Sequence, residues 1–208
     1  MTTPVLPAAD AAALARAIEL LRAGAVIAIP TETVYGVCAL PLEEPVARLI
    51  QVKRRSADKG IQLLVDSFDQ VRELAIVTRA AEQLAEGFWP GGLTIVLERR
   101  PDVDLPVLLG GGRPTLGLRL PDHHFPRSLA RRLGPIAASS ANVSGEPPAT
   151  DATVVERTLA DVLALIVDDG PVRGGMASTV VDCSSAAGSP RVLREGAISA
   201  ADITAALR

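Results

Sequence analysis

Lysine and aromatic residues are what this sequence has least of. Of its 21 Lys and Arg residues only two are lysines, Lys53 and Lys59, and aromatic residues make up 2 % of the 208 residues. The hydrophobic content is nevertheless 48 %, so the core has to be built from Ala, Val, Leu and Ile. A chain of this length buries a substantial core and fits one compact domain.

Cysteines and long apolar segments are scarce as well. Cys38 and Cys183 are far apart and fit neither a CxxC motif nor a zinc-ligand spacing, so we expect two buried apolar side chains rather than a disulfide. The N-terminus has no positive segment followed by an apolar one, and no apolar run reaches membrane-spanning length. We therefore expect no signal peptide, no membrane partner and a cytoplasmic location.

The charge balance and the missing motifs exclude several classes of protein. The net charge is −3 and the pI about 5.5, which disfavours a dedicated nucleic-acid binder but allows a local basic pocket. There is no GxxxxGK[ST], no GxGxxG after a strand and no GxSxG. His123 and His124 are adjacent, with no carboxylate at a spacing typical of a metal triad. We interpret them as helix-entry residues and expect no metal held by the protein.

Apolar periodicity and capping residues predict a chain in which helices and strands alternate. Helices are expected at 11–23, 43–53, 79–88, 124–133 and 152–160, with short ones after Ser67 and Ser199. Strands are expected at 25–30, 61–66, 94–100, 115–120, 135–140, 163–169, 178–184 and 190–195. This order predicts an α/β fold, a single domain over residues 8–208, with a twisted, mixed open sheet and helices packed on it. Residues 101–114, which include a triple glycine, are expected to be irregular.

The segment 53–60, KRRSADKG, contains both lysines of the chain and two arginines between them. It leaves a predicted helix and enters a predicted buried strand, at a position where open sheets bind ligands. Three or four cations at such a place suit a polyphosphate, since arginine binds it bidentately and lysine acts as a mobile point charge. The alternative is a solvated helix end whose cations complement the helix dipole.

Four further segments place polar residues at the ends of predicted strands. They are PTETVYG (30–36), Arg119 in TLGLRL, SSANVSGEPP (139–148) and GGMASTVVD (174–182), with Arg194 after the last strand. Each also has a plain interpretation as a polar turn or loop, and Arg119 as a strand-end side chain facing solvent. The functional interpretation of Arg119 is a clamp for a substrate carboxylate.

Together these segments resemble the YrdC/TsaC family of threonylcarbamoyl-AMP synthases. The resemblance rests on six ordered blocks, which are IPTETVYGV, KRRSADKGIQLLV, FWPGGLTIVL, TLGLRLPDH, SSANVSGEPP and STVVD…VLREG. It covers about residues 11–198. It implies a YrdC-like fold, a twisted open α/β sheet with a basic cavity on its concave side, and it implies the short form of the family.

The resemblance also implies a reaction and its partners. The expected enzyme is a nucleotidyltransferase that converts L-threonine, bicarbonate and ATP into L-threonylcarbamoyl-AMP and pyrophosphate. A separate transferase complex then passes the threonylcarbamoyl group to an adenosine of tRNA, and weak binding of tRNA by this chain is left open. ATP is a substrate, and we expect any Mg²⁺ to be carried by its phosphates.

The family's site residues map onto ten positions of this sequence. The resemblance assigns threonine binding to Thr31, Arg119 and Ser178. It assigns ATP binding to Lys53, Arg55, Lys59, Thr115, Ser140, Asn142 and Arg194. Lys53, Arg55, Ser140 and Asn142 are expected to be catalytic. Ser56 and Gly92 depart from the family pattern, where proline is common at both positions, and we expect them to affect binding rather than the reaction.

Three alternatives to this function have to be weighed. One is a paralogue that forms a carbamoyl-adenylate, but such chains are long and carry acylphosphatase and zinc-finger modules that are missing here. Another is an RNA-binding module with a YrdC-like fold, against which the acidic pI argues. The third is an inactive paralogue, which the presence of Lys53, Arg55, Ser140 and Asn142 disfavours.

Overall fold

A computed structural model describes residues 3–184 and 188–208. The helices are α1 (Ala11–Arg22), α2 (Glu43–Val52), α3 (Phe68–Leu74), α4 (Arg79–Phe88), α5 (His124–Leu133), α6 (Ala152–Leu159) and α7 (Ala200–Ala206), with 3-10 turns η1 (Val107–Gly110) and η2 (Ala160–Val162). The predicted caps of α1, α3, α4 and α7 are confirmed, because Asp10, Ser67, Thr78 and Ser199 each accept a hydrogen bond from a backbone N–H of the first turn.

The strands of the described residues form one mixed sheet. They are β1 (Val5–Pro7), β2 (Ile27–Ile29), β3 (Gly36–Ala39), β4 (Gln62–Leu64), β5 (Ala75–Ile76), β6 (Leu93–Arg99), β7 (Thr115–Arg119), β8 (Ile136–Ser140), β9 (Ile166–Asp168), β10 (Thr179–Asp182) and β11 (Arg191–Arg194). Their order is β1-β9-β2-β3-β8-β4-β7-β6-β10-β11, and β5 pairs with β6. The predicted α/β fold with a mixed sheet is confirmed.

Strand bounds differ from the prediction in two ways. Most strands are shorter than expected, as β4 and β9 illustrate, because the apolar runs continue past the last ladder hydrogen bond into buried loops. Three strands were not predicted: β1, β3 and β5. β1 lies before residue 8, where we expected the domain to begin, and pairs in parallel with β9. β3 follows the polar turn after β2 and pairs with it antiparallel, so the chain reverses at 30–35.

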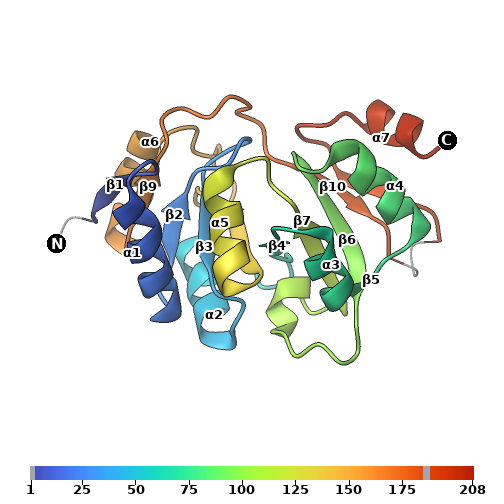
Figure 1. Cartoon of the computed structure of the whole chain (residues 1–208), viewed down its shortest axis with the longest axis horizontal. Coiled ribbons are helices and arrows are strands. Elements are labelled where there is room, and N and C mark those ends of the chain that lie inside the picture. The colour runs from blue at the N-terminus through green and yellow to red at the C-terminus, as the bar shows by residue number, and fades with distance from the viewer. Residues whose placement is uncertain (1–2, 185–187) are drawn as a thin grey trace.

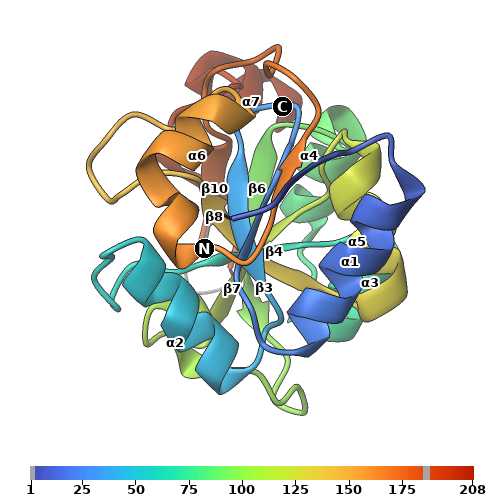
Figure 2. The same cartoon turned by 90° about the vertical axis from the view of Figure 1, so that its left-hand side faces the viewer.

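The sheet carries helices on both faces, as the two views in Figures 1 and 2 show. In Figure 2, α1, α3 and α5 lie on one side of the strands, and α2 and α6 lie on the other. One hydrophobic cluster joins α1 and α5 to β2 and β9, with Phe125 and Leu129 among its buried members. The other is larger and includes Leu49 of α2, Leu84 of α4 and Val155 of α6.

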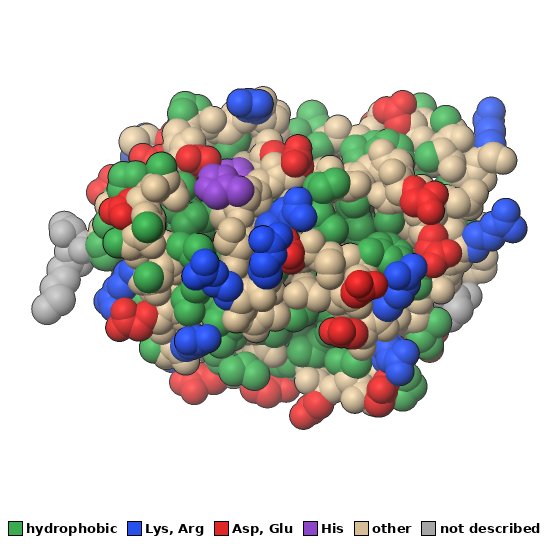
Figure 3. Space-filling view, in the orientation of Figure 1, with side chains coloured by type: hydrophobic (Ala, Val, Ile, Leu, Met, Phe, Trp, Pro, Cys, Tyr) green, Lys and Arg blue, Asp and Glu red, His purple; other side chains and the backbone are tan. Residues whose placement is uncertain are grey.

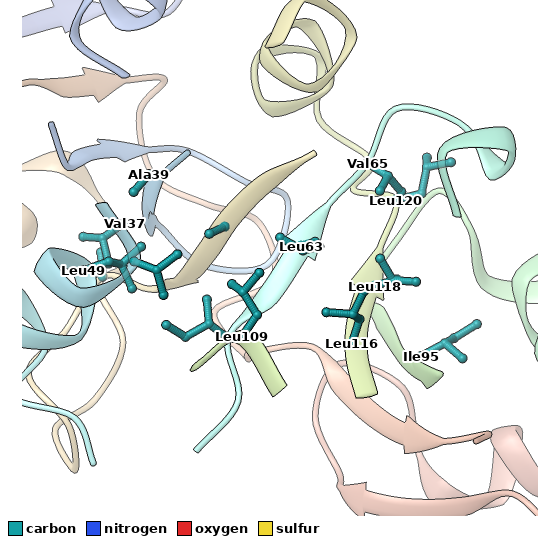
Figure 4. Packing of buried hydrophobic residues seen from close by; sticks show 14 of the residues in the cluster. Val37, Ala39, Leu49, Leu63, Val65, Ile95, Leu109, Leu116, Leu118 and Leu120 are labelled. Carbon is teal, nitrogen blue, oxygen red and sulfur yellow. The ribbon is translucent and has the colours of Figure 1, made fainter. Parts of the chain in front are cut away.

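Side chains along β6 and β7 point alternately to the two faces of the sheet, and this alternation determines where a site can form. Ile95, Leu116 and Leu118 are buried in the larger cluster (Figure 4). The residues between them, such as Thr94 and Gly117, point to the other side of the same strands and line a cavity. One face of this half of the sheet therefore belongs to the core, and the other is open to a ligand.

The two cysteines are buried, unpaired side chains, as predicted. Burial raises the pKa of Cys183 to about 12 and that of Cys38 still further. Both thiols therefore stay protonated at neutral pH and act as small apolar residues. Among the described residues, no helix is long and apolar enough to cross a membrane.

Candidate active site

A cavity of about 250 Å³ runs across six neighbouring strands, from β8 through β4, β7, β6 and β10 to β11. Four arginines line it, Arg55, Arg113, Arg119 and Arg194, and its described lining contains no aspartate or glutamate. Serine, threonine and glutamine side chains supply the remaining polar groups. A lining of this kind favours anionic ligands that accept several hydrogen bonds.

Six of the ten predicted site residues line this cavity. They are Arg55, Thr115, Arg119, Ser140, Ser178 and Arg194. They come from β7, β8, β11 and the loops beside β4 and β10, so residues from positions 55 to 194 meet on one sheet face. The other four, Thr31, Lys53, Lys59 and Asn142, do not line it.

The basic loop 53–60 carries Arg55 into the cavity. Helix α2 ends at Val52, and Arg54 has a φ of 48°, which reverses the chain. The guanidinium of Arg55 donates to the carbonyls of Lys59 (3.3 Å) and Gly60 (2.9 Å), so the loop is closed by its own arginine. Burial lowers the pKa of Arg55, and the neighbouring Asp58 opposes this shift. Arg54 and Lys59 are exposed to solvent.

Lys53 takes a different place from the one expected for a phosphate ligand. Its side chain is buried, and Nζ donates to the carbonyl of Asn142 (2.9 Å), to Asn142 Oδ1 (3.2 Å) and to the carbonyl of Ser140. Burial, together with the charge of Arg55, lowers the pKa of Lys53 to about 8. Lys53 therefore ties the end of α2 to the loop after β8.

Asn142 belongs to the same arrangement. Its Oδ1 accepts from Lys53 and from Ser140 Oγ (2.6 Å), and its Nδ2 donates to the carbonyls of Val143 (2.9 Å) and Glu146 (2.7 Å). All of its polar atoms are thus used inside the loop. Of the two residues, Ser140 lines the cavity and Asn142 does not.

Arg119 is 2 % exposed, which excludes the solvent-facing interpretation. Its Nε donates to the carbonyl of Gly91 (3.1 Å), and its Nη2 donates to Glu32 Oε1 (2.7 Å) and Thr33 Oγ1 (2.8 Å). Sequence analysis did not assign Glu32 or Thr33 to the site. The available signal was an arginine inside an apolar strand, which requires a buried partner.

Thr31 does not line the cavity and instead contacts Thr33, one of the partners of Arg119. Its hydroxyl donates to the carbonyl of Val34 (2.6 Å) and lies 3.0 Å from Thr33 Oγ1, and the backbone N–H groups of Thr33 and Val34 point at it. The segment after β2 is therefore the hydroxyl-closed turn that we gave as the plain alternative. It supports Thr33, which in turn contacts Arg119.

A second group of hydroxyls lies on β6 and before β10. Ser178 Oγ is 2.8 Å from Thr94 Oγ1, and Thr94 also donates to Gln62 Oε1 (2.7 Å). Arg194 donates to the carbonyl of Ser178 (2.6 Å). Partial burial and the like charges of Arg55 and Arg119 lower the pKa of Arg194. Thr94 and Gln62 were missed by sequence analysis because isolated polar residues in strands carry no distinctive signal.

The two histidines depart from the expectation that no carboxylate joins them. His123, His124 and Asp169 are the trio in the described part of the chain whose potential metal-ligand atoms lie within 4.8 Å of one another. The two histidines form a single purple patch in Figure 3, at the start of α5. Nevertheless, both ring nitrogens of His123 are engaged, since Nε2 lies 3.1 Å from Asp169 and Nδ1 accepts the N–H of Phe125. Burial lowers the pKa of His123, and its Nδ1 accepts a hydrogen bond, so the ring is neutral and Nε2 donates to Asp169. These contacts explain the patch as a helix cap with a hydrogen bond to a carboxylate.

Several known proteins have sequences similar to that of this chain over most of its length. A protein of Mycobacterium tuberculosis is 37 % identical over 185 residues, which is 88 % of this chain and 83 % of that protein. The threonylcarbamoyl-AMP synthases of Bacillus subtilis and Pyrococcus abyssi are 38 % and 39 % identical over 93 % and 88 % of this chain. The chain spans only 56 % and 53 % of the length of these two relatives.

Solved structures of related proteins resemble this chain in fold as well. Sua5 of P. abyssi in complex with L-threonine superposes with a TM-score of 0.90 at 34 % identity, over 99 % of this chain and 61 % of the Sua5 chain. YciO of Escherichia coli shares the fold, with a TM-score of 0.81 at 23 % identity and coverage of 93 % and 94 %. The family model described as "Telomere recombination" matches residues 19–196. The chain therefore belongs to the Sua5/YciO/YrdC family.

Proposed function

We propose that this protein is an L-threonylcarbamoyl-AMP synthase, a nucleotidyltransferase that joins L-threonine, bicarbonate and ATP and releases pyrophosphate. The observation that carries the proposal is the cavity, which is lined by four arginines and, in its described part, by no carboxylate. The named relatives with this activity support it.

The reaction brings several negative groups together. The triphosphate of ATP and the carboxylate of threonine have to lie side by side with bicarbonate, and fixed cations are required to offset their repulsion. The neutral amine of threonine attacks the carbon of bicarbonate, a C–N bond forms and water leaves, which gives a carbamate. A carbamate oxygen then attacks the α-phosphorus, a new P–O bond forms, and pyrophosphate leaves with the electrons of the broken P–O bond. Such a step depends on alignment and charge stabilisation, and needs no covalent nucleophile from the protein.

The lining residues divide naturally between the two substrates. In our proposal Arg55, Arg194, Ser140 and Thr115 hold the nucleotide, and Arg119 and Ser178 hold threonine. Lys53, Asn142 and Thr31 act from behind the lining, because their polar atoms are bonded within the loops that present it. Lys59, which is exposed, would reach the phosphates only if the basic loop closed over them.

A magnesium ion fits this site only as a companion of ATP. No carboxylate is found among the described lining residues, so this lining offers none of the anionic oxygen ligands typical of a dedicated Mg²⁺ site. Mg²⁺ bound to the phosphates would neutralise part of their charge. We further propose that the protein works in the cytoplasm and delivers its product to a transferase that modifies tRNA.

The test is pyrophosphate release by the purified protein with ATP, Mg²⁺, bicarbonate and L-threonine. We expect release that depends on threonine and on bicarbonate, together with a product that has the mass of L-threonylcarbamoyl-AMP. Release that is unchanged without threonine contradicts the proposal. Release that instead requires carbamoyl phosphate would identify a carbamoyl-adenylate-forming enzyme, and salt-dependent tRNA binding without any turnover would identify an RNA-binding module.

A further inference from the structure

Glu32 carries an oxygen that has no partner. Oε1 accepts from Arg119, whereas Oε2 is the buried side-chain polar atom of the described residues for which no hydrogen bond is found. Leaving a buried carboxylate oxygen unpaired is unfavourable, and in native proteins such an atom calls for an explanation, such as a water, an ion or a ligand that binds there. The side chain as a whole is 21 % exposed although Oε2 itself is buried, so Glu32 lies at the edge of the interior beside Arg119.

The hydrogen bonds of Arg119 show where a substrate carboxylate can bind. Nε is engaged by Gly91, and the two Nη2 hydrogens by Glu32 and Thr33. Nη1 forms no hydrogen bond with the described residues, and Arg119 lines the cavity. A carboxylate held by Nη1 therefore lies on the same guanidinium whose Nη2 donates to Glu32.

An α-amino acid brings a positive group to this position. Its ammonium group is attached to the carbon next to the carboxylate, so it must lie close to Arg119 as well. The described cavity lining offers an ammonium group only arginines as charged neighbours, which repel it. A buried ammonium group needs a carboxylate or other acceptors to compensate for lost hydration.

We propose that Glu32 is the specificity-determining residue for the α-amino group, with its free Oε2 accepting a hydrogen bond from the ammonium of the amino acid whose carboxylate is held by Arg119. The Arg119–Glu32 pair then binds both charged groups of an amino acid, with Arg119 on the carboxylate and Glu32 on the ammonium group. This inference rests on the proposed function, because it concerns the amino-acid substrate of the same site.

Other carboxylates near this end of the sheet are already engaged. Asp169 pairs with His123, and Asp66 pairs with Arg127 (3.1 Å) and Arg131 (2.8 Å). His123 is close enough for its charge to interact with Glu32, but its burial favours the neutral ring. His123 therefore does not replace the substrate as the cation for Oε2.

The experiment compares two ligands that differ only in the amine. Dissociation constants for L-threonine and for 3-hydroxybutanoate, the same skeleton without the amino group, are measured by calorimetry in the wild type and in Glu32→Gln. A charge-assisted hydrogen bond is typically strong enough to change affinity roughly tenfold. We expect Glu32→Gln to weaken threonine binding roughly tenfold and to leave 3-hydroxybutanoate binding unchanged or tighter, because Arg119 loses its internal counter-charge.

The controls separate this role from a structural one. Asp66→Asn, which removes another arginine-paired carboxylate, should leave the ratio of the two affinities as in the wild type. Glu32→Asp should keep part of the preference. Equal weakening of both ligands by Glu32→Gln, or no change in either, overturns the inference.

The same measurement distinguishes failure of the inference from failure of the proposed function. If the wild type ignores threonine but binds another α-amino acid in preference to its des-amino analogue, and Glu32→Gln abolishes that preference, the role of Glu32 stands and the threonine assignment is wrong. If the wild type binds no α-amino acid, both are wrong.

Discussion

At the scale of single residues, Lys53 and Arg55 are two positions apart yet act differently. Arg55 reaches the cavity, whereas the ammonium group of Lys53 is buried on the loop 140–142. Since Nζ donates to the carbonyl and side-chain oxygens of this loop, we expect the loop to depend on the charge of Lys53.

The first prediction concerns pH and Lys53. Its pKa in the folded protein is about 8, below the ordinary lysine value of 10.5, so its ammonium group loses its proton as the pH rises through about 8. We expect kcat/KM for ATP to fall on the alkaline side of pH 8. Between pH 8 and 10.5 the unfolded chain binds more protons, so the Lys53 contribution to the free energy of unfolding rises there with pH.

Lys53→Met is the control for both effects. It should have a low kcat/KM for ATP with no alkaline fall of this origin, and it should lack the Lys53 contribution to the rise in stability. Denaturant unfolding and initial rates from pH 7 to 10.5 measure the two quantities. An unchanged alkaline fall in the variant would show that another group titrates.

The second prediction separates Arg55 from its neighbour. Arg55→Ala removes a lining cation, and we expect it to lower kcat/KM for ATP roughly 10- to 100-fold, since a lost charged hydrogen bond costs about 1.5–3 kcal/mol. The affinity for threonine alone should change little. The matched control is Arg54→Ala, because Arg54 is exposed and should be close to wild type. Similar losses in both variants would mean that only the net charge of the loop matters.

At the scale of elements, the triple glycine supports the basic loop. The N–H of Ile61 donates to the carbonyl of Leu109 (2.8 Å), and Arg113 reaches the carbonyl of Asp58. A Cβ on Gly111, whose φ is 62°, would lie 2.3 Å from the carbonyl oxygen of Asp58. The turn after η1 and the loop 53–60 are therefore packed backbone to backbone, which only glycine permits here.

The third prediction uses two neighbouring glycines. Gly111 and Gly112 both have positive φ, but a Cβ on Gly112 would meet nothing within 4 Å. We expect Gly112→Ala to cost about 1 kcal/mol of stability from backbone strain alone. Gly111→Ala should cost more and should also weaken ATP binding, because it displaces the loop that carries Arg55. Thermal unfolding and ATP titrations of the two variants test this, and equal ATP affinities would refute the coupling.

At the scale of the whole molecule, the sheet gathers like charges before any ligand arrives. Burial lowers the pKa of Arg194, and the nearby charges of Arg55 and Arg119 lower it further. Repulsion between these cations is unfavourable in the free protein and is relieved when phosphates or carboxylates bind. This relief contributes to the affinity for anions.

The fourth prediction follows from this stored repulsion. Saturating ATP should raise Tm by roughly 5–10 °C, because a ligand at about 100 times its Kd stabilises the folded state by about 2.7 kcal/mol. The rise should be smaller at high salt. In Arg194→Ala the rise should shrink while the Tm of the free protein stays equal or increases. A lower Tm for the free variant would show that Arg194 is mainly structural, which calorimetry or fluorescence can decide.

Most helices and strands, and the residue types of the site, follow from local signals in the sequence. Caps such as Ser67 and Thr78 fix helix starts locally, so they were predicted correctly. The six ordered blocks indicated the family and the residue types of the site. Short strands such as β1 and β3 were missed because three or four apolar residues form a strand only when a neighbour pairs with them, and pairing is non-local.

Tertiary structure alone decided which of these residues face the cavity. The side chains of Lys53 and Asn142 form hydrogen bonds within the loop after β8, and the hydroxyl of Thr31 closes a turn. Glu32 and Thr33 contact Arg119 although they lie 87 and 86 positions before it in the sequence. The register of β8, β4, β7, β6 and β10 places alternate side chains on the cavity face of the sheet. A shift of one residue in any of these strands would move those side chains to the opposite face. Because register and burial arise only when distant segments pair, the sequence could name the cations of the site but not their partners.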